Sequence, residues 1–163
     1  MCIIIDTNSF ASVFNQKSSD HDQFQPIKNW IYSGSGRIVY GGTKYLLELT
    51  RSGKYLKIFV ELGNIRKATI LDKKKVDRME RDIKEKNTNP YFNDTHIVAI
   101  VVISGCRIVC SKDSSSDVFL KDKRLYPKNF KVPKIYRDRG NVHLISNSSI
   151  KSNCAICKNR ESL

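Results

Sequence analysis

Short apolar runs alternate along the chain with longer segments whose apolar positions recur every three or four residues. Residues 1–5 and 108–110 are wholly apolar and are followed at once by polar residues, and strands are expected at 1–6 and 107–110. Apolar runs of this length, bounded by polar breakers, are typical of buried strands in a parallel sheet. Weaker patterns of the same kind predict further strands at 37–40, 68–71 and 142–145.

Between these runs, the three-and-four spacing predicts helices. In residues 73–86, for example, Val76, Met79 and Ile83 fall on one helical face. The other helices are expected at 10–14, 27–31, 44–51, 55–62, 94–104 and within 114–125, and residues 15–26 are expected to form a loop that ends at Pro26. Strands that alternate with helices predict an α/β fold, with a central, mainly parallel sheet and helices on both faces.

The 163 residues contain no internal repeat and no evident linker, which predicts a single domain over 1–163. Its core is expected to span about 1–145, followed by a basic tail, residues 146–163, that carries Cys154 and Cys157. A structural zinc site needs four ligands, and no second cysteine pair accompanies this one, so packing of the two thiols is the favoured reading. The apolar runs are too short to cross a membrane and no signal peptide precedes them, so we expect a cytoplasmic protein.

Charge narrows the choice of partner. Lysine and arginine total 29 against 16 acidic residues, a formal net charge of +13. Such a surplus favours binding to polyanions, chiefly nucleic acid, although a generally basic proteome would produce the same surplus. Lys112, Lys121, Lys123 and Arg124 are the candidate phosphate contacts, with aromatic residues interleaved after them. A solvated basic surface over packed aromatic rings remains an alternative reading of this segment.

Four acidic residues stand at positions where an acid is locally unfavourable. Asp6 and Asp113 follow the two apolar strands, Glu48 lies among leucines, and Asp94 opens an almost wholly apolar helix. Ligands bind at the carboxyl ends of parallel strands, so Asp6 and Asp113 should meet there. Asp94 should lie at the same edge because its helix runs back across the sheet to the strand before Asp113. Carboxylates held close together repel one another unless a proton or a cation lies between them.

Each acid also has a structural reading taken singly. Asp94 is in a position to cap its helix, Asp6 and Asp113 are in positions typical of strand-end turns, and Glu48 suits an exposed helical face. Taken together these structural explanations are weaker, because all four acids would then converge on one edge of the sheet by accident. A hydrated Mg²⁺ held by a few carboxylates would explain the cluster. His96, two positions after Asp94, is expected to point away from it and to be structural.

The four segments around these acids resemble the motifs of the PIN-domain nucleases. Residues 3–8 (IIIDTN), 45–49 (YLLEL), 93–99 (NDTHIVA) and 110–113 (CSKD) are similar to the four motifs, in order and in spacing, across residues 1 to about 125. Residues 139–142 (RGNV) look like a strand start that some bacterial members have. In one departure from the family pattern, Ser114–Ser116 stand where many members have further acids.

The resemblance implies a three-layer α/β/α fold and a metal-dependent endonuclease that acts on single-stranded RNA. It places catalysis on Asp6, Glu48, Asp94 and Asp113, with Mg²⁺ or Mn²⁺ bound by the three aspartates. Supporting roles are implied for Thr7, Asn8, Ser111 and Asp117. It also implies a toxin or defence effector, with an antitoxin or other regulatory protein as partner. Separately from the resemblance, the exposed apolar faces expected on the helices favour a homodimer.

Two other functions remain open at this point. A protein of the same fold could bind RNA or regulate without cleaving it, and a related enzyme could act on single-stranded or flap DNA. The first predicts salt-dependent binding with no cleavage. A side-by-side panel of RNA and DNA substrates would separate all three.

Overall fold

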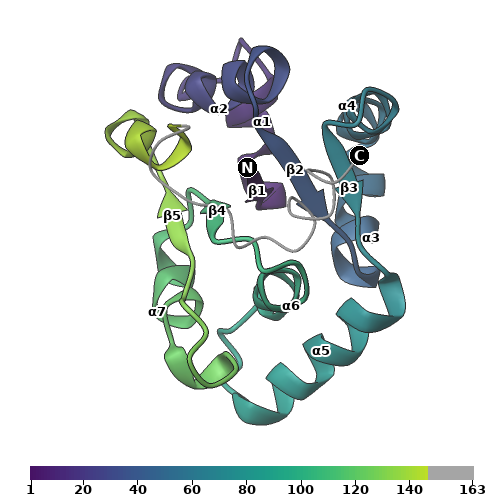
Figure 1. The fold of residues 1–163 in the computed structure, drawn as a ribbon, viewed down its shortest axis with the longest axis vertical. Helices are drawn as coiled ribbons and strands as arrows, with labels where there is room; N and C mark the ends of the chain where they lie inside the picture. Colours follow the sequence, from purple (N-terminus) through teal and green to yellow (C-terminus); the bar gives the residue numbers. More distant parts are fainter. Residues whose placement is uncertain (147–163) are drawn as a thin grey trace.

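The computed structural model describes residues 1–146 and shows an α/β fold around a five-stranded sheet (Figure 1). The strands are β1 (Cys2–Ile5), β2 (Arg37–Tyr40), β3 (Ala68–Ile70), β4 (Ile108–Cys110) and β5 (Lys134–Tyr136). They lie in the order β3-β2-β1-β4-β5, and every neighbouring pair is parallel. The expected tail, with Cys154 and Cys157, lies outside the described residues apart from Ser146.

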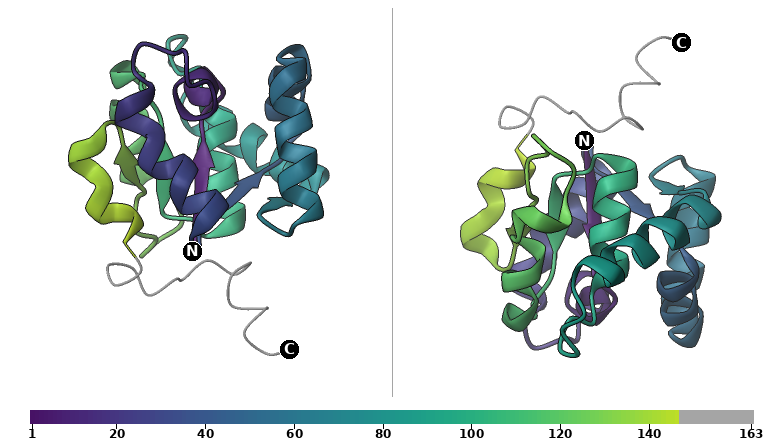
Figure 2. Two further views of the ribbon diagram at one scale, coloured as in Figure 1. Left: turned by 90° about the horizontal axis from the view of Figure 1, so that it is seen from above. Right: turned by 90° about the horizontal axis from the view of Figure 1, so that it is seen from below.

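Helices cover both faces of the sheet, which confirms the predicted three-layer architecture. The α-helices are α1 (Phe10–Phe14), α2 (His21–Ser33), α3 (Thr43–Arg51), α4 (Gly53–Asn64), α5 (Lys73–Lys86), α6 (Thr95–Ser104) and α7 (Asp117–Leu120). Short 3-10 helices are η1 (Thr7–Ser9), η2 (Ser114–Ser116), η3 (Lys123–Leu125) and η4 (Arg139–Ile145). Helices α1, α2 and α4 lie on one side of the sheet, and α5, α6 and α7 lie on the other (Figures 1 and 2).

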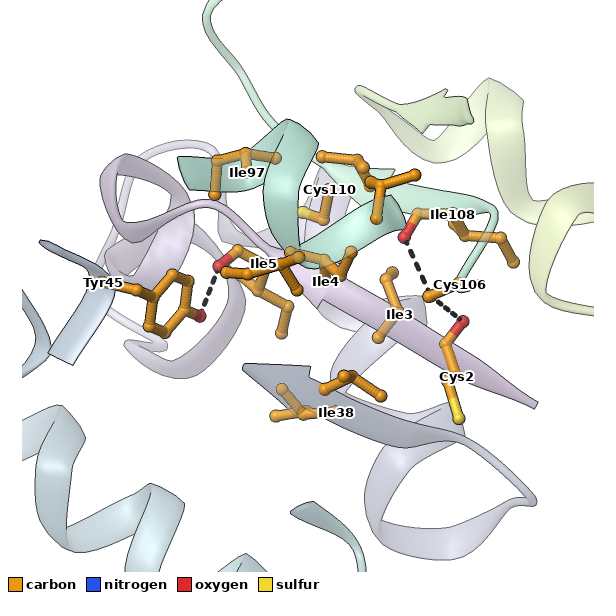
Figure 3. Packing of buried hydrophobic residues seen from close by; sticks show 14 of the residues in the cluster. Cys2, Ile3, Ile4, Ile5, Ile38, Tyr45, Ile97, Cys106, Ile108 and Cys110 are labelled. Atoms are coloured by element: carbon orange, nitrogen blue, oxygen red, sulfur yellow. Dashed lines mark hydrogen bonds between the residues drawn. The ribbon is translucent and has the colours of Figure 1, made fainter. Parts of the chain in front are cut away.

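The two central strands carry the most buried part of the core. Ile3, Ile4 and Ile5 of β1 have no exposed surface, and β1 pairs with β2 on one side and β4 on the other. The register sets Ile5 opposite Cys110, so β1 and β4 end side by side (Figure 3). A strand buried on both faces needs an apolar side chain at every position, which explains the continuous apolar runs.

The chain reverses its direction of travel across the sheet between β1 and β4. From β1 it proceeds outward to β2 and β3, then returns through α5 and α6 to β4 on the other side of β1. This is a topological switch point, the place where open parallel sheets leave a crevice for ligands at the carboxyl ends of their strands. The residues that follow β1 and β4 are therefore the first to consider as a site.

Helix α6 matches its prediction closely. Eight of its ten residues are buried, and it ends at Gly105, which adopts the left-handed conformation with φ of 69°. Glycine is favoured at such a helix end because it has no Cβ to clash. None of the helices within residues 1–146 is both long enough and apolar enough to span a membrane.

The prediction for residues 142–145 is wrong. They belong to η4, and the last strand is β5, which pairs with β4 through Ile135 opposite Val109. The Asp138 side chain accepts a 2.8 Å hydrogen bond from the Gly140 backbone N–H and starts the 3-10 turn. A three-residue strand among lysines has too weak a pattern to be recognised before its partner strand is known.

The loop predicted for residues 15–26 is also wrong in its second half. Helix α2 begins at His21 and contains Pro26. Proline removes one helical hydrogen bond, which disfavours an interior position. The helix nevertheless buries Phe24, Ile27 and Ile31, and this burial outweighs the local penalty. Tertiary packing thus overrides the local breaker signal.

Helix α3 begins at Thr43, one residue before the expected start of this helix at residue 44. Gly42 occupies the N-cap position with φ of 81°, and Thr43 is the first helical residue. Thr43 Oγ1 instead donates to Asp77 Oδ2 at 2.6 Å, and its backbone N–H donates to Asp77 Oδ1. Because Asp77 lies on α5, it caps α3 from a neighbouring helix.

Candidate active site

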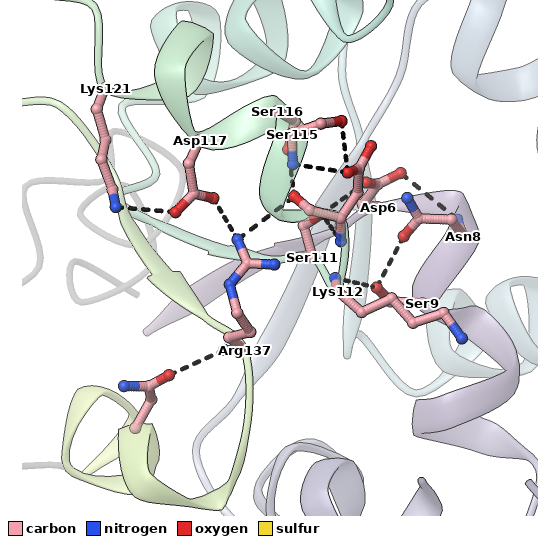
Figure 4. Close-up of polar contacts among 12 residues, drawn as sticks. Asp6, Asn8, Ser9, Ser111, Lys112, Ser115, Ser116, Asp117, Lys121 and Arg137 are labelled. Carbon is pink, nitrogen blue, oxygen red and sulfur yellow. Dashed lines mark hydrogen bonds and ion pairs between the residues drawn. The ribbon is translucent and has the colours of Figure 1, made fainter. Parts of the chain in front are cut away.

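Asp6 occupies the carboxyl end of β1 at the switch point and is only 4% exposed. Its backbone N–H donates to the Cys110 carbonyl at 2.9 Å, which continues the pairing of β1 with β4. Its Oδ2 accepts a 2.9 Å hydrogen bond from Ser111 Oγ, and its Oδ1 accepts a 3.5 Å bond from the Asn8 backbone N–H (Figure 4). A buried carboxylate is thus held in a fixed position by groups that follow the two central strands.

The environment of Asp6 disfavours its negative charge. Burial and the nearby charge of Asp94 raise the pKa of Asp6 to about 6, against the opposing effect of the Ser111 and Asn8 hydrogen bonds and of His96. A carboxylate kept buried at this cost is more typical of functional sites than of structural ion pairs.

Asp94 stands at the N-cap position of α6, yet its side chain makes no capping hydrogen bond. Burial raises the pKa of Asp94, and the charges of Asp113 and Glu48 add to this, whereas His96 and Lys44 oppose it. Lys44 donates from Nζ to the Asn93 carbonyl and so lies beside this residue. The Asp94 side chain therefore does not cap α6 in this structure.

Glu48 reaches the same place from α3. The Tyr45 hydroxyl, fully buried one turn earlier, donates to the Ile5 carbonyl at 2.6 Å and fixes the helix against the end of β1 (Figure 3). Glu48 Oε2 accepts a 2.7 Å hydrogen bond from Thr7 Oγ1. Burial raises the pKa of Glu48, but His96, Thr7 and Lys44 outweigh it, and the pKa lies below its ordinary value.

His96 is expected from the sequence to point away from Asp94 and to be structural, but in the structure it lies beside another of the acids, Glu48. Its Nε2 lies 3.5 Å from Oε2 of Glu48, and its ring is 1% exposed. Neither ring nitrogen makes a hydrogen bond within residues 1–146. The helical spacing between residues 94 and 96 was a poor guide because Asp94 precedes α6, so the two positions are not both helical. The signal that would have found His96 is its place in the first turn of a helix that opens at the crevice.

Asp113 follows β4 and completes the group of four acids. Its Oδ1 accepts hydrogen bonds from the backbone N–H of Ser115 at 2.8 Å and from Ser115 Oγ at 2.6 Å. These bonds, together with the charge of Arg137, hold the pKa of Asp113 below its usual value. Asp113 therefore stays ionised, while its charge helps to raise the pKa of Asp94.

Asp117 does not join this group. Its carboxylate pairs with Lys121 Nζ at 2.9 Å and with the Arg137 guanidinium, which also donates to the Asp113 carbonyl (Figure 4). Arg137 follows β5, and because that strand has no clear local pattern, no feature of the residue order placed Arg137 beside Asp113. Asp117 thus supports the 113–117 segment rather than the crevice.

Three of the four candidate nucleic-acid contacts pair with aspartates. Lys112 Nζ lies 3.4 Å from Asp20 Oδ2, Lys121 pairs with Asp117, and Arg124 pairs with Asp122 at 2.8 Å. Lys123 is exposed on η3. These pairs reduce the net positive charge of this region, although each cation retains exposed surface.

The four acids supply carboxylate oxygens, the ligands that a hard divalent cation prefers, but they do not form a complete ligand set. Within residues 1–146, no three His, Cys, Asp or Glu side chains are already arranged as a metal-binding group. Mg²⁺ commonly keeps several water molecules and is bound by only one or two carboxylates, so a closed protein cage is not required. The mutual repulsion of Asp6 and Asp94, with burial, is the feature that a cation would relieve. The residues present therefore fit a hydrated divalent ion.

Comparisons of the chain with protein-family models, with curated proteins and with solved structures found no match. The resemblance to the PIN-domain nucleases accordingly stays a prediction that rests on the four motifs. The fold and the convergence of the acids stand independently of it.

Proposed function

We propose that this protein is a metal-dependent endonuclease that cleaves single-stranded RNA. The observation that supports the proposal is a cluster of four acidic side chains that influence one another electrostatically: Asp6, Glu48, Asp94 and Asp113. They come from four separate segments, and burial and mutual repulsion raise the pKa of Asp6 and of Asp94. Proteins retain such unfavourable clusters chiefly where chemistry needs them.

The proposed metal ligands are Asp6, Asp94 and Asp113, which would bind the ion directly or through the water molecules that it keeps. Mg²⁺ or Mn²⁺, when bound, supplies a polarised water for in-line attack and charge neutralisation at the scissile phosphate. Ser111 fixes the orientation of Asp6 through its 2.9 Å hydrogen bond. Asn8 holds the second oxygen of Asp6 from its backbone N–H.

Glu48 is the proposed acceptor for the proton of the attacking water. It remains ionised near neutral pH because its pKa is lowered; Thr7 donates a hydrogen bond to its Oε2, and His96 Nε2 lies 3.5 Å from the same oxygen. An ionised, oriented carboxylate can accept a proton, and its lowered pKa makes it a weaker base than a carboxylate that titrates near neutral pH.

The test is a substrate panel with matched variants. Labelled single-stranded RNA, single-stranded DNA and flap DNA of one sequence are incubated with Mg²⁺, Mn²⁺ or EDTA. We expect metal-dependent cleavage of the RNA, and loss of cleavage in Asp6→Asn and Asp94→Asn. Asp82→Asn, the same change at an exposed position of α5, is the control and should cleave normally. Undiminished cleavage by Asp6→Asn would overturn the site assignment.

A non-catalytic RNA-binding protein is the second candidate. It is favoured by the absence, within residues 1–146, of three acidic or other ligating side chains already set around an ion. In the same panel it predicts RNA binding that weakens steeply with salt, with no cleavage under any divalent ion. Preferential cleavage of the DNA substrates would instead identify a DNA nuclease.

We also propose a role as a toxin or defence effector in the cytoplasm, with a regulatory protein as partner. Leu47, adjacent to Glu48 in the sequence, is 54% exposed, which supports a surface that a partner covers. Val60 and Ile65 are similarly exposed apolar residues on and after α4, and they support a homodimer. Light scattering of the purified protein tests the dimer, and co-expression with the product of the adjacent gene tests the partner.

A further inference from the structure

A pocket of about 370 Å³ opens between the end of α5 and the segment containing α7 and η3. One wall is formed by Lys86 and the loop after it, including Asn87 and Asn89. The facing wall includes Phe119 and Arg124. Its volume is within the range of small-ligand sites, and its lining combines an aromatic ring with cationic and amide groups. None of the four proposed catalytic acids lines it.

The pocket is linked by the chain to the candidate active site. Asn89 and Asp94 are five residues apart, so their Cα atoms lie within about 18 Å of each other. The turn between them shortens this further, since the Phe92 N–H donates to the Asn89 carbonyl at 3.0 Å. One short single-stranded oligonucleotide could therefore occupy both places.

Phe119 presents a suitable surface for a nucleobase. Its ring is stacked on Phe92, with centroids 4.5 Å apart and planes 13° from parallel. Phe119 lines the pocket whereas Phe92, 6% exposed, does not. The packed ring of Phe92 thus holds Phe119 in place from outside the pocket. A rigid aromatic face of this kind is the usual platform for an unpaired base.

Arg124 offers donors for a phosphate. Asp122 accepts from its Nε and NH2 groups at 2.9 and 2.8 Å, which fixes the plane of the guanidinium. Of the five N–H groups of an arginine, these bonds engage two, and the others have no partner within residues 1–146. The side chain is 87% exposed, so those donors are accessible. Lys86 supplies a second exposed positive charge on the opposite wall.

The two asparagines add hydrogen-bonding groups for a base edge. Asn87 Oδ1 accepts from the Asn89 N–H at 3.0 Å, and Asn89 Oδ1 accepts from the Tyr91 N–H at 2.9 Å. These bonds use the carbonyl oxygens of the two side chains and orient their NH₂ groups, which remain available as donors.

We propose that this pocket binds one nucleotide of a single-stranded nucleic acid, with its base on Phe119 and its phosphate on Arg124 and Lys86. The inference rests on the proposed function, to which it adds a second contact that positions the strand across the acids. Binding at this pocket needs no metal and no cleavage, so the two claims can fail separately.

The experiment measures the affinity of a short labelled oligouridylate by fluorescence anisotropy in EDTA, with oligodeoxyuridylate of the same length as the DNA arm. Phe119→Leu keeps an apolar side chain but removes the aromatic face, and we expect it to weaken binding at least about fivefold. Phe130→Leu is its matched control, because Phe130 is likewise half-buried and stacked, on Tyr126, outside the pocket. It should bind as the wild type does.

Arg124→Ala is a second variant, at a side chain that is 87% exposed and outside the packed core. A thermal melt checks that it stays folded after the pair with Asp122 is lost. We expect it to weaken binding more than Lys57→Ala, the loss of an equal charge on the exposed side of α4. If Phe119→Leu and Arg124→Ala bind as well as their controls do, the pocket proposal is overturned, whether or not the protein cleaves RNA. If they bind weakly while no substrate is cleaved, the pocket stands and the nuclease proposal fails. Stronger effects on one of the two oligonucleotides would identify the sugar that the pocket prefers.

Discussion

Replacing Asp6 by asparagine should make the protein more stable near neutral pH. Asparagine has nearly the shape of a protonated aspartic acid, and it carries no charge. Burial and the charge of Asp94 raise the pKa of Asp6 from 3.8 to about 6, so its ionised form is the unfavourable one in the folded protein. The substitution removes that unfavourable form while it leaves the packing of the site almost unchanged.

The magnitude follows from the pKa. A shift of about two units corresponds to about 3 kcal/mol. Because the folded state holds the proton more tightly than the unfolded state, the free energy of unfolding of the wild type falls as pH rises from about 4 to 6. The variant lacks this titration. The two proteins should therefore be about equally stable near pH 4, and Asp6→Asn should be more stable by up to about 3 kcal/mol at pH 7.

Urea unfolding in EDTA at several pH values measures this difference, and thermal melts should show a rise of about 6–12 °C at pH 7. Asp82→Asn, on the exposed side of α5, keeps Asp6 and should therefore match the wild type at every pH. Added Mg²⁺ should stabilise the wild type and Asp82→Asn, but not Asp6→Asn, by about 3 kcal/mol at a hundred times its dissociation constant. A difference between Asp6→Asn and wild type that stays constant from pH 4 to pH 7 would refute the reasoning.

Three further outcomes are expected. Hydrogen bonds from Ser18 and Ser12 lower the pKa of Asp20 to about 2, so its ionised form stabilises the folded protein. Asp20→Asn should therefore destabilise the protein by about 1–2 kcal/mol at pH 7, and the difference should vanish as pH falls through 4 towards 2. Urea unfolding at a series of pH values measures this. Tyr45→Phe should cost about 1–3 kcal/mol in chemical denaturation, since it leaves the buried Ile5 carbonyl without its 2.6 Å hydrogen bond. The Asp117 carboxylate pairs with Arg137 and Lys121, so Asp117→Asn should lower the melting temperature while it retains most of any cleavage activity. Loss of activity with no change in the melting temperature would contradict this assignment.

Much of the fold could be predicted because its central elements have strong local patterns. Strands buried on both faces must be continuously apolar, which made β1 and β4 recognisable. Helix α5 kept its apolar residues on one face and matched its predicted bounds. Strand β5 and the first part of α2 could not be found, since one is stabilised by pairing with β4 and the other by burial of its apolar side chains.

For the candidate site, the sequence by itself determined which acids were unusual. An aspartate directly after a buried strand, or at the head of an apolar helix, is locally unfavourable, and that is visible from the order of residues alone. The parallel topology then made the convergence of Asp6, Asp94 and Asp113 predictable, because parallel strands end at the same edge of the sheet.

Only the tertiary structure decided what surrounds those acids. It brought His96 to within 3.5 Å of Glu48, and it directed Asp117 to Arg137 rather than to the crevice. It also placed Phe119 on Phe92 beside a pocket that no local pattern indicates. These contacts join residues from separate elements, and their distances depend on how helices pack over the sheet. The sequence by itself therefore identified the candidate acids, whereas the packing of helices over the sheet decided which residues contact them and how their pKa values shift.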